Sequence, residues 1–129
     1  MSRRAASHPT DAELEILRIL WRQGPLLVRE VTEELNRVRP TGYTTALKLL
    51  QIMTQKGSVK RVADGRAHRY SAAESREGTQ ERMVRDLAAR AFGGSASQLV
   101  ERLLRGENVD RGELAAIRRL VDELESRTC

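Results

Sequence analysis

Apolar residues recur at helical spacing in three successive segments of the first half of the chain. The segments carry Leu14, Ile16, Leu17, Leu20 and Trp21; then Val28, Val31 and Leu35; then Ala46, Leu47, Leu49, Leu50 and Met53. Spacings of three and four residues place such side chains on one face of a helix. The pattern therefore predicts three amphipathic helices that share a core built mainly from aliphatic side chains.

Capping and turn residues mark the ends of these predicted helices. Thr10 and Glu13 have the spacing of a capping box, and Gly24-Pro25 ends the first helix. A turn signal at residues 39–42 separates the second helix from the third. The third helix is predicted over residues 43–56, because the glycine that follows favours a left-handed helix end.

A strand-like pattern replaces the helical period after the third helix. Residues 59–63 and 67–71 are rich in β-prone side chains and flank an Asp-Gly pair. Such a pair between two strand-like segments predicts a β-hairpin. With Asp64-Gly65 as a two-residue loop, Lys60 would lie opposite Arg69. An anionic partner would relieve the repulsion between these two cations.

Three further helices are predicted in the second half of the chain. Ser71 and Glu74 have capping-box spacing and would begin the fourth helix, while Gly93-Gly94 would end it. The last helix carries apolar residues at a heptad-like spacing. These helices hold little core by themselves, so we expect them to pack against a second copy of the chain. Packing on the first half of the same chain is the alternative. The candidate dimer-interface residues are Leu99, Leu103, Leu114, Ile117, Val121 and Leu124.

The predicted fold class is mainly α with a small β-hairpin. Residues 1–9 are expected to be a disordered basic leader. Residues 10–71 are expected to form a winged helix-turn-helix domain, because a helix with a polar outer face precedes a basic two-stranded wing. Residues 72–129 are expected to form a helical dimerisation domain.

Charge is distributed unevenly between these two parts of the chain. Residues 1–71 carry a net charge of +6 and residues 72–129 a net charge of −1, which together make the net +5 of the chain. The first part is therefore the candidate surface for a polyanion. The single cysteine, Cys129, excludes an intramolecular disulfide and fits a cytoplasmic protein. No apolar run approaches the roughly 18 residues of a membrane span, so no membrane insertion is expected.

Residues that could support catalysis or bind a metal are sparse. The two histidines, His8 and His68, lie in the leader and in the hairpin, away from any nucleophile that the pattern would place beside them. The chain has no paired-cysteine or paired-histidine spacing, so we predict neither a metal nor another cofactor. We therefore do not expect an enzyme.

The chemistry that the residues do favour is DNA binding. In a helix-turn-helix, the second helix of the pair enters the major groove by its N-terminal end. Threonine hydroxyls and methyls suit base edges, and lysine suits guanine acceptors or phosphates. The predicted base-reading residues are Tyr43, Thr44, Thr45 and Lys48. The predicted backbone contacts are Lys60, Arg66, His68 and Arg69. The alternatives are helix capping and turn chemistry by the two threonines, and a merely solvated hairpin.

Three phrases of this sequence occur together in the order of a known family. They are TDAELEILRILWRQGPLLVREV, YTTALKLLQIMTQKG and GRAHRYS. With them the chain resembles the penicillinase-repressor family (BlaI/MecI/CopY type) over about residues 9–126. The resemblance implies an N-terminal winged helix, a C-terminal dimerisation region and repression by homodimers on palindromic operator DNA. It also implies base reading by Thr44, Thr45 and Lys48 and backbone contacts from residues 66–69.

The resemblance further implies a membrane metalloprotease sensor as a partner, which triggers cleavage of the repressor in its C-terminal region. The candidate cleavage bond here is Arg102-Leu103, where some members have Asn-Phe. Copper-responsive members carry a CxC pair that the single Cys129 does not supply. We therefore expect a dimeric repressor. The alternative is a winged-helix protein-interaction module without DNA binding.

Overall fold

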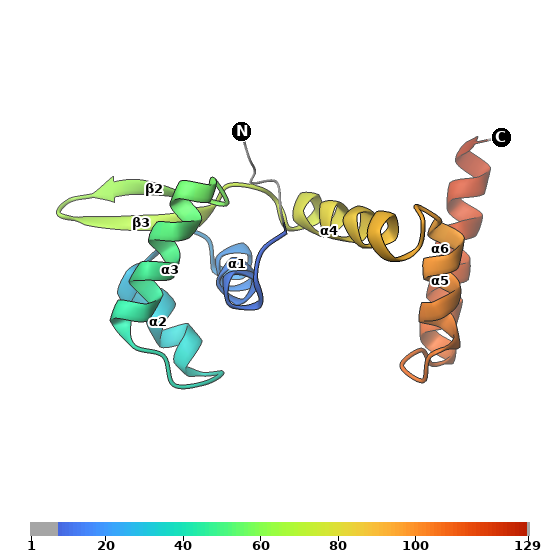
Figure 1. Ribbon diagram of the computed structural model, residues 1–129, viewed down its shortest axis with the longest axis horizontal. Helices are drawn as coiled ribbons and strands as arrows, with labels where there is room; N and C mark the ends of the chain where they lie inside the picture. Colours follow the sequence, from blue (N-terminus) through green and yellow to red (C-terminus); the bar gives the residue numbers. More distant parts are fainter. Residues whose placement is uncertain (1–7, 129) are drawn as a thin grey trace. The chain divides into compact units, whose positions relative to one another are not determined.

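A computed structural model describes residues 8–128 of the protein. The elements in chain order are α1 (Asp11–Gln23), β1 (Leu26–Leu27), α2 (Val28–Asn36), α3 (Tyr43–Lys56), β2 (Val59–Asp64), β3 (Ala67–Ala72), α4 (Arg76–Ala91), α5 (Ala96–Arg105) and α6 (Arg111–Thr128) (Figure 1). This mainly helical arrangement with one small sheet confirms the predicted fold class. The predicted disorder of the leader concerns mostly residues 1–7, which lie outside the described residues, as does Cys129.

The chain forms two compact units. The first ends at Met83 and the second begins at Val84, so the border falls within α4. The border between two domains that the sequence predicts at residues 71–72 remains a prediction.

The core of the first unit joins the three predicted apolar stripes to the sheet. Its largest fully buried side chains are Ile16 of α1, Val31 of α2, and Leu50 and Met53 of α3. Val59 of β2 and Tyr70 of β3 close the core from the sheet side. The helical periodicity therefore predicted correctly which side of each helix faces inward.

One buried carboxylate ties the start of α1 to the end of α3. Glu13 is only 4% exposed. Its Oε1 accepts a hydrogen bond from the backbone N–H of Thr10, and its own N–H donates to the Thr10 hydroxyl, so the predicted capping box is confirmed. Its Oε2 lies 2.9 Å from Nζ of Lys56. The sequence predicted the cap but not this link to α3.

Replacing Glu13 by alanine should lower the free energy of unfolding by about 2 kcal/mol, because Lys56 and the first turn of α1 each lose an acceptor. Urea denaturation followed by circular dichroism measures this change. Glu33→Ala, at an exposed position of α2, is the matched control and should cost less than about 0.5 kcal/mol. Equal stability of the Glu13→Ala and wild-type proteins would contradict the structural role of this carboxylate.

The sheet contains a strand that the sequence pattern did not predict. β1 has only two residues, too few to show an alternating pattern. It pairs antiparallel with β3, so that Leu26 lies opposite Tyr70 and Leu27 opposite Arg69. The strand order is β1-β3-β2, and the hairpin is thereby attached to the segment that begins α2.

The register of the hairpin differs from the predicted one by two residues. Asp64 lies opposite Ala67, so the loop is Gly65-Arg66 rather than Asp64-Gly65. Gly65 has a φ of +66°, and a positive φ at the first of two central residues is the pattern of a type II′ turn. Lys60 consequently lies opposite Ser71. The predicted pairing of Lys60 with Arg69 is wrong, so repulsion between directly opposed cations gives no reason to expect an anionic partner there.

The start of α4 also differs from the prediction. Ser71 lies within β3, where it pairs with Lys60, and cannot cap a helix. The helix begins at Arg76, and the hydroxyl of Ser75 accepts a hydrogen bond from the N–H of Gly78 at 3.0 Å. The expected capping box of Ser71 and Glu74 is therefore wrong. Glu74 instead accepts hydrogen bonds from Thr79 and Arg82 of α4.

The second unit has almost no core within a single chain. Neither α5 nor α6 contains a buried residue. Large apolar side chains along both helices are between 39% and 55% exposed: Val100, Leu103, Leu114, Leu120, Val121 and Leu124. None of the described helices is both long and apolar enough to cross a membrane.

Candidate nucleic-acid interface

The predicted base-reading residues lie on the exposed side of α3. Its inward side is defined by the buried residues Ala46, Leu50 and Met53. With 3.6 residues per turn, Thr44 and Lys48 point roughly opposite that side. Tyr43 and Thr45 stand at the two flanks of this outer row. All four predicted readers are exposed, and Tyr43 retains 54% of its accessible surface.

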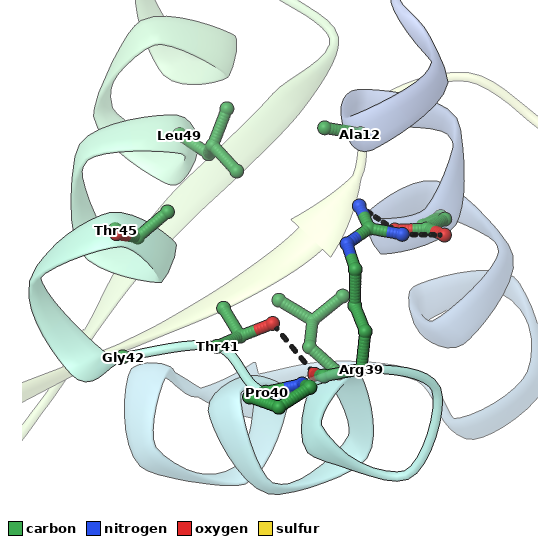
Figure 2. Close-up of a pocket in the computed structure, with 9 residues that line it drawn as sticks. Ala12, Arg39, Pro40, Thr41, Gly42, Thr45 and Leu49 are labelled. Carbon is green, nitrogen blue, oxygen red and sulfur yellow. Dashed lines mark hydrogen bonds and ion pairs between the residues drawn. The ribbon is translucent and has the colours of Figure 1, made fainter.

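Side-chain hydrogen bonds hold the turn that leads into α3. The amide of Asn36 donates to the carbonyl oxygen of Thr41 at 2.7 Å and accepts from the N–H of Thr41 at 3.0 Å. Arg39 forms two hydrogen bonds of 2.8 Å with the carboxylate of Glu15 (Figure 2). The N-terminal end of α3 is therefore tied to both α2 and α1. The sequence analysis identified the turn but not the residues that hold it.

The capping alternative for the two threonines is not what the structure shows. Gly42 is the N-cap of α3, and no side-chain bond to this cap is found within the described residues. The turn chemistry belongs to Thr41, whose hydroxyl donates to the carbonyl oxygen of Arg39 at 3.0 Å (Figure 2). Thr45 instead lines a hollow of about 190 Å³ between α3 and α1. Base reading by Thr44 and Thr45 stays a prediction.

A second hollow, of about 340 Å³, lies between α3 and the wing. Its lining brings together three residues predicted from the sequence, namely Tyr43 of α3, Arg66 of the hairpin loop and His68 of β3. Arg29, in the first turn of α2, lines the same hollow. We call this set of Arg29, Tyr43, Arg66 and His68 the wing hollow. Three of its four side chains carry or can carry a positive charge, so the surface is suited to an anion.

Arg29 is the functional candidate that sequence reasoning missed. It lies outside both the third helix and the hairpin, and only the folded chain brings it beside them. One local signal was available. A cation in the first turn of a helix is unfavourable for the helix dipole, so an exposed arginine at this position of α2 needs another explanation.

Arg69 has different surroundings from the other predicted phosphate contacts. Its Nε lies 2.7 Å from Oδ2 of Asp64, and its Nη1 lies 3.4 Å from Oε1 of Glu30. The same oxygen of Glu30 accepts the N–H of Leu27 at 2.8 Å. Arg69 therefore links the wing to the start of α2. Its guanidinium is thus engaged by two carboxylates, and its contact with the DNA backbone stays a prediction.

The strand register separates the predicted phosphate contacts into two groups. Residues directly opposite each other in an antiparallel pair share a face, and neighbours along a strand alternate. His68, opposite Ala63, therefore lies on the face that also carries the buried Tyr70. Lys60 and Arg69 lie on the other face. Arg66 and His68 are thus brought together with Tyr43, while Lys60 and Arg69 are not.

Among the described residues, no group of three or more His, Cys, Asp or Glu side chains is placed to hold a metal ion.

Comparison with known proteins gives a family. The model of the family described as Penicillinase repressor matches residues 9–123. The transcriptional regulator BlaI of Mycobacterium tuberculosis is 34% identical over 119 residues, which cover 90% of this chain and 84% of that protein. The penicillinase repressor of Bacillus licheniformis is 21% identical over 118 residues, which cover 92% of each.

A solved structure agrees with this result at the level of the fold. The DNA-binding domain of the repressor BlaI matches with a TM-score of 0.51 at 24% identity, over 59% of this chain and 90% of that domain. The fold of the first unit is therefore the winged helix expected from the sequence, and the family match extends beyond it into α6. The chain belongs to the penicillinase repressor family.

Proposed function

We propose that this protein represses transcription by binding double-stranded operator DNA as a homodimer, with the N-terminal end of α3 in the major groove. Family membership supports DNA binding and repression. The observation that carries the proposal is the exposed row of Thr44 and Lys48 on a helix whose start is tied to α1 and α2. A reading helix needs such fixed placement, because base contacts depend on hydrogen-bond geometry.

The wing hollow supplies the second part of the proposed interface. Arg29, Arg66 and His68 surround a space beside the first turn of α3. A phosphate of the DNA backbone there would neutralise the two guanidinium groups and fix the register of α3 on the bases. Arg69 acts in this proposal as a positioning residue, since its bonds to Asp64 and Glu30 hold the wing against α2. Lys60 stays a proposed backbone contact on the other face of the wing.

A gel-shift titration with the DNA upstream of the protein's own coding region tests the proposal. We expect a retarded band at low salt and a steep loss of affinity as salt rises, because phosphate contacts release counterions. No retarded band at low salt would sink the proposal. It would favour the alternative of a winged helix that binds another protein.

Replacing Arg29 by alanine should weaken operator binding by roughly 30-fold. A phosphate contact worth about 1 kcal/mol is lost twice in a homodimer, and 1.4 kcal/mol corresponds to a factor of ten. The slope of log affinity against log salt should fall by about two. Arg18→Ala, at an exposed position of α1 that lines neither hollow, is the control. A salt slope unchanged by Arg29→Ala would remove Arg29 from the interface.

The second unit supports the homodimer. Leu103, Leu114, Val121 and Leu124 are exposed, and Leu99 and Ile117 are only partly covered. Apolar rows of this kind on otherwise charged helices are stabilised when a partner covers them. We propose that the same rows of a second copy provide that cover. The two α3 helices would then address a palindromic operator whose half-sites lie about one helical turn, or a multiple of one, apart.

Release by proteolysis is the remaining part of the proposal, and it rests on the family resemblance. The candidate bond Arg102-Leu103 lies in the last turns of α5, and both of its residues are exposed in the single chain. In the proposed dimer, the second copy would cover Leu103. Proteases act on locally opened chain, so this end of α5 would have to unwind first. A membrane metalloprotease sensor is the proposed partner, and the repressor itself would act in the cytoplasm, where its DNA target lies.

A further inference from the structure

Four residues form a polar cluster where the winged helix passes into α4. The backbone carbonyl of Glu74 accepts a hydrogen bond from the indole N–H of Trp21, on α1, at 2.9 Å. The side chain of Glu74 accepts from the hydroxyl of Thr79 at 2.8 Å and from the guanidinium of Arg82, both at Oε1. Thr79 is only 2% exposed. We call Trp21, Glu74, Thr79 and Arg82 the Glu74 clasp. All four residues belong to the first unit.

The clasp connects the end of α1 to the start of α4 within the first unit. Trp21 packs against the core at the end of α1, while Thr79 and Arg82 lie in the first two turns of α4. Glu74 lies between them, in the segment that joins β3 to α4. The neighbouring N–H of Ala73 donates to the carbonyl oxygen of Ser58 at 2.9 Å, so this segment is also tied to the residue that precedes β2.

Gly78 gives Glu74 the space that the clasp needs. A Cβ at Gly78 would lie 3.1 Å from Cγ and 3.2 Å from Oε2 of Glu74. Glycine inside a helix is unfavourable relative to alanine, and its presence in the first turn of α4 is explained by the side chain of Glu74 lying over it.

The charge state of Glu74 agrees with this geometry. Burial raises the pKa of the Glu74 carboxyl, but the hydrogen bonds from Arg82 and Thr79 and the charge of Arg82 together lower that pKa below its ordinary value of 4.5. Because the pKa of Glu74 is lower in the folded than in the unfolded chain, ionised Glu74 stabilises the fold at pH values above the unfolded-state pKa. This stabilisation is lost as pH falls through the folded-state pKa. Glu74 is therefore ionised at neutral pH and paired with Arg82.

We propose that the Glu74 clasp sets the direction in which α4 leaves the winged helix, and thereby selects the spacing between the two half-sites of the operator. The inference rests on the proposed binding of a dimer to a palindrome. In that dimer α4 is the connection between each reading helix and the dimerising unit. Glu74 is a positioning residue here and touches no base.

The length of α4 makes spacing sensitive to a small change in direction. Its 16 residues correspond to about 24 Å at 1.5 Å per residue. A change of about 10° at the clasp would move the far end of such a rod by about 4 Å. Successive base pairs are about 3.4 Å apart along the DNA axis. A loosened clasp would therefore reduce the difference in affinity between operators whose spacers differ in length by one base pair.

The test uses the full-length protein and duplexes that this protein selects from a random pool. Affinity is measured for one isolated half-site and for palindromes whose central spacer is varied one base pair at a time. Glu74→Ala should change half-site affinity less than about twofold. The preference for the best spacer over its neighbours should fall from at least tenfold to about twofold.

Three further variants separate the clasp from simpler effects. Glu77→Ala makes the same charge change at an exposed position in the first turn of α4 and should keep the wild-type spacer preference. Glu74→Gln retains an acceptor oxygen and should restore most of the preference. Thr79→Val removes one donor at nearly constant volume, and it carries the test if Glu74→Ala does not fold.

Different outcomes would overturn the proposed DNA-binding function and the proposed role of the Glu74 clasp. A wild-type protein that selects no duplex and binds no half-site would overturn the proposed function itself. A wild-type protein that binds half-sites but accepts every spacer equally would overturn the clasp alone. The same holds if Glu74→Ala and Thr79→Val keep the full spacer preference.

Discussion

Replacing Lys48 by alanine should weaken operator binding by between roughly 30-fold and 10⁴-fold without unfolding the protein. Lys48 is exposed one turn beyond Thr44 on the outer row of α3. A lysine contact to a guanine acceptor or a phosphate is worth about 1–3 kcal/mol, and a homodimer loses it twice. The total of about 2–6 kcal/mol gives the stated range. Folding should change by less than about 0.5 kcal/mol, since no core contact is lost.

Fluorescence anisotropy with a labelled operator at fixed salt measures the effect of Lys48→Ala. Single base-pair changes in the operator then distinguish a contact to a base from a contact to a phosphate. If Lys48 reads a base, the variant loses discrimination at one position of each half-site. If it holds a phosphate, affinity falls uniformly and the salt slope decreases. Lys48→Arg keeps the charge and is the matched variant. Unchanged affinity of Lys48→Ala would mean that the outer row of α3 does not meet the DNA.

Replacing Val121 by aspartate should convert the protein to a monomer and weaken operator binding by more than 100-fold. Val121 retains 49% of its surface in the single chain and belongs to the apolar row of Leu114, Ile117 and Leu124. In a two-fold dimer the substitution would bury two unpaired carboxylates, each at a cost of several kcal/mol. Each half-site would then be bound separately, and the gain from joining two sites would be lost.

Sedimentation velocity measures the oligomeric state of this variant. Ser126→Asp adds the same charge to α6, and the helical period places it on the opposite side from Val121. This control should remain a dimer. The Val121→Asp monomer should still bind an isolated half-site with wild-type affinity, because α3 is untouched. A dimer that persists at micromolar concentration would reject this interface and leave the proposed DNA contacts unaffected.

The errors of the sequence analysis have identifiable physical causes. The hairpin register was wrong by two residues because a slip of two leaves every side chain on the same face, so the hydrophobic pattern cannot detect it. The turn decided the register, since Gly65 occupies the first central position with a positive φ. The cap of α4 was wrong because Ser71 and Ser75 are both suitable caps locally. Pairing of Ser71 with Lys60 in the sheet removed the first choice.

By itself, the sequence determined the features that depend on near neighbours along the chain. The capping box of Thr10 and Glu13 and the bounds of α3 follow from residues within a turn or two of each other. The outer row of Thr44 and Lys48 follows in the same way, because helical periodicity determines which side chains face the core.

Only the tertiary structure decided which distant side chains meet. It brought Arg29 beside Arg66 and His68 in the wing hollow, and it engaged Arg69 with Asp64 and Glu30. It also formed the Glu74 clasp, in which Trp21 and Glu74 are 53 residues apart. Such contacts leave no periodic or capping signal, because they depend on how whole elements pack rather than on the residues that flank them.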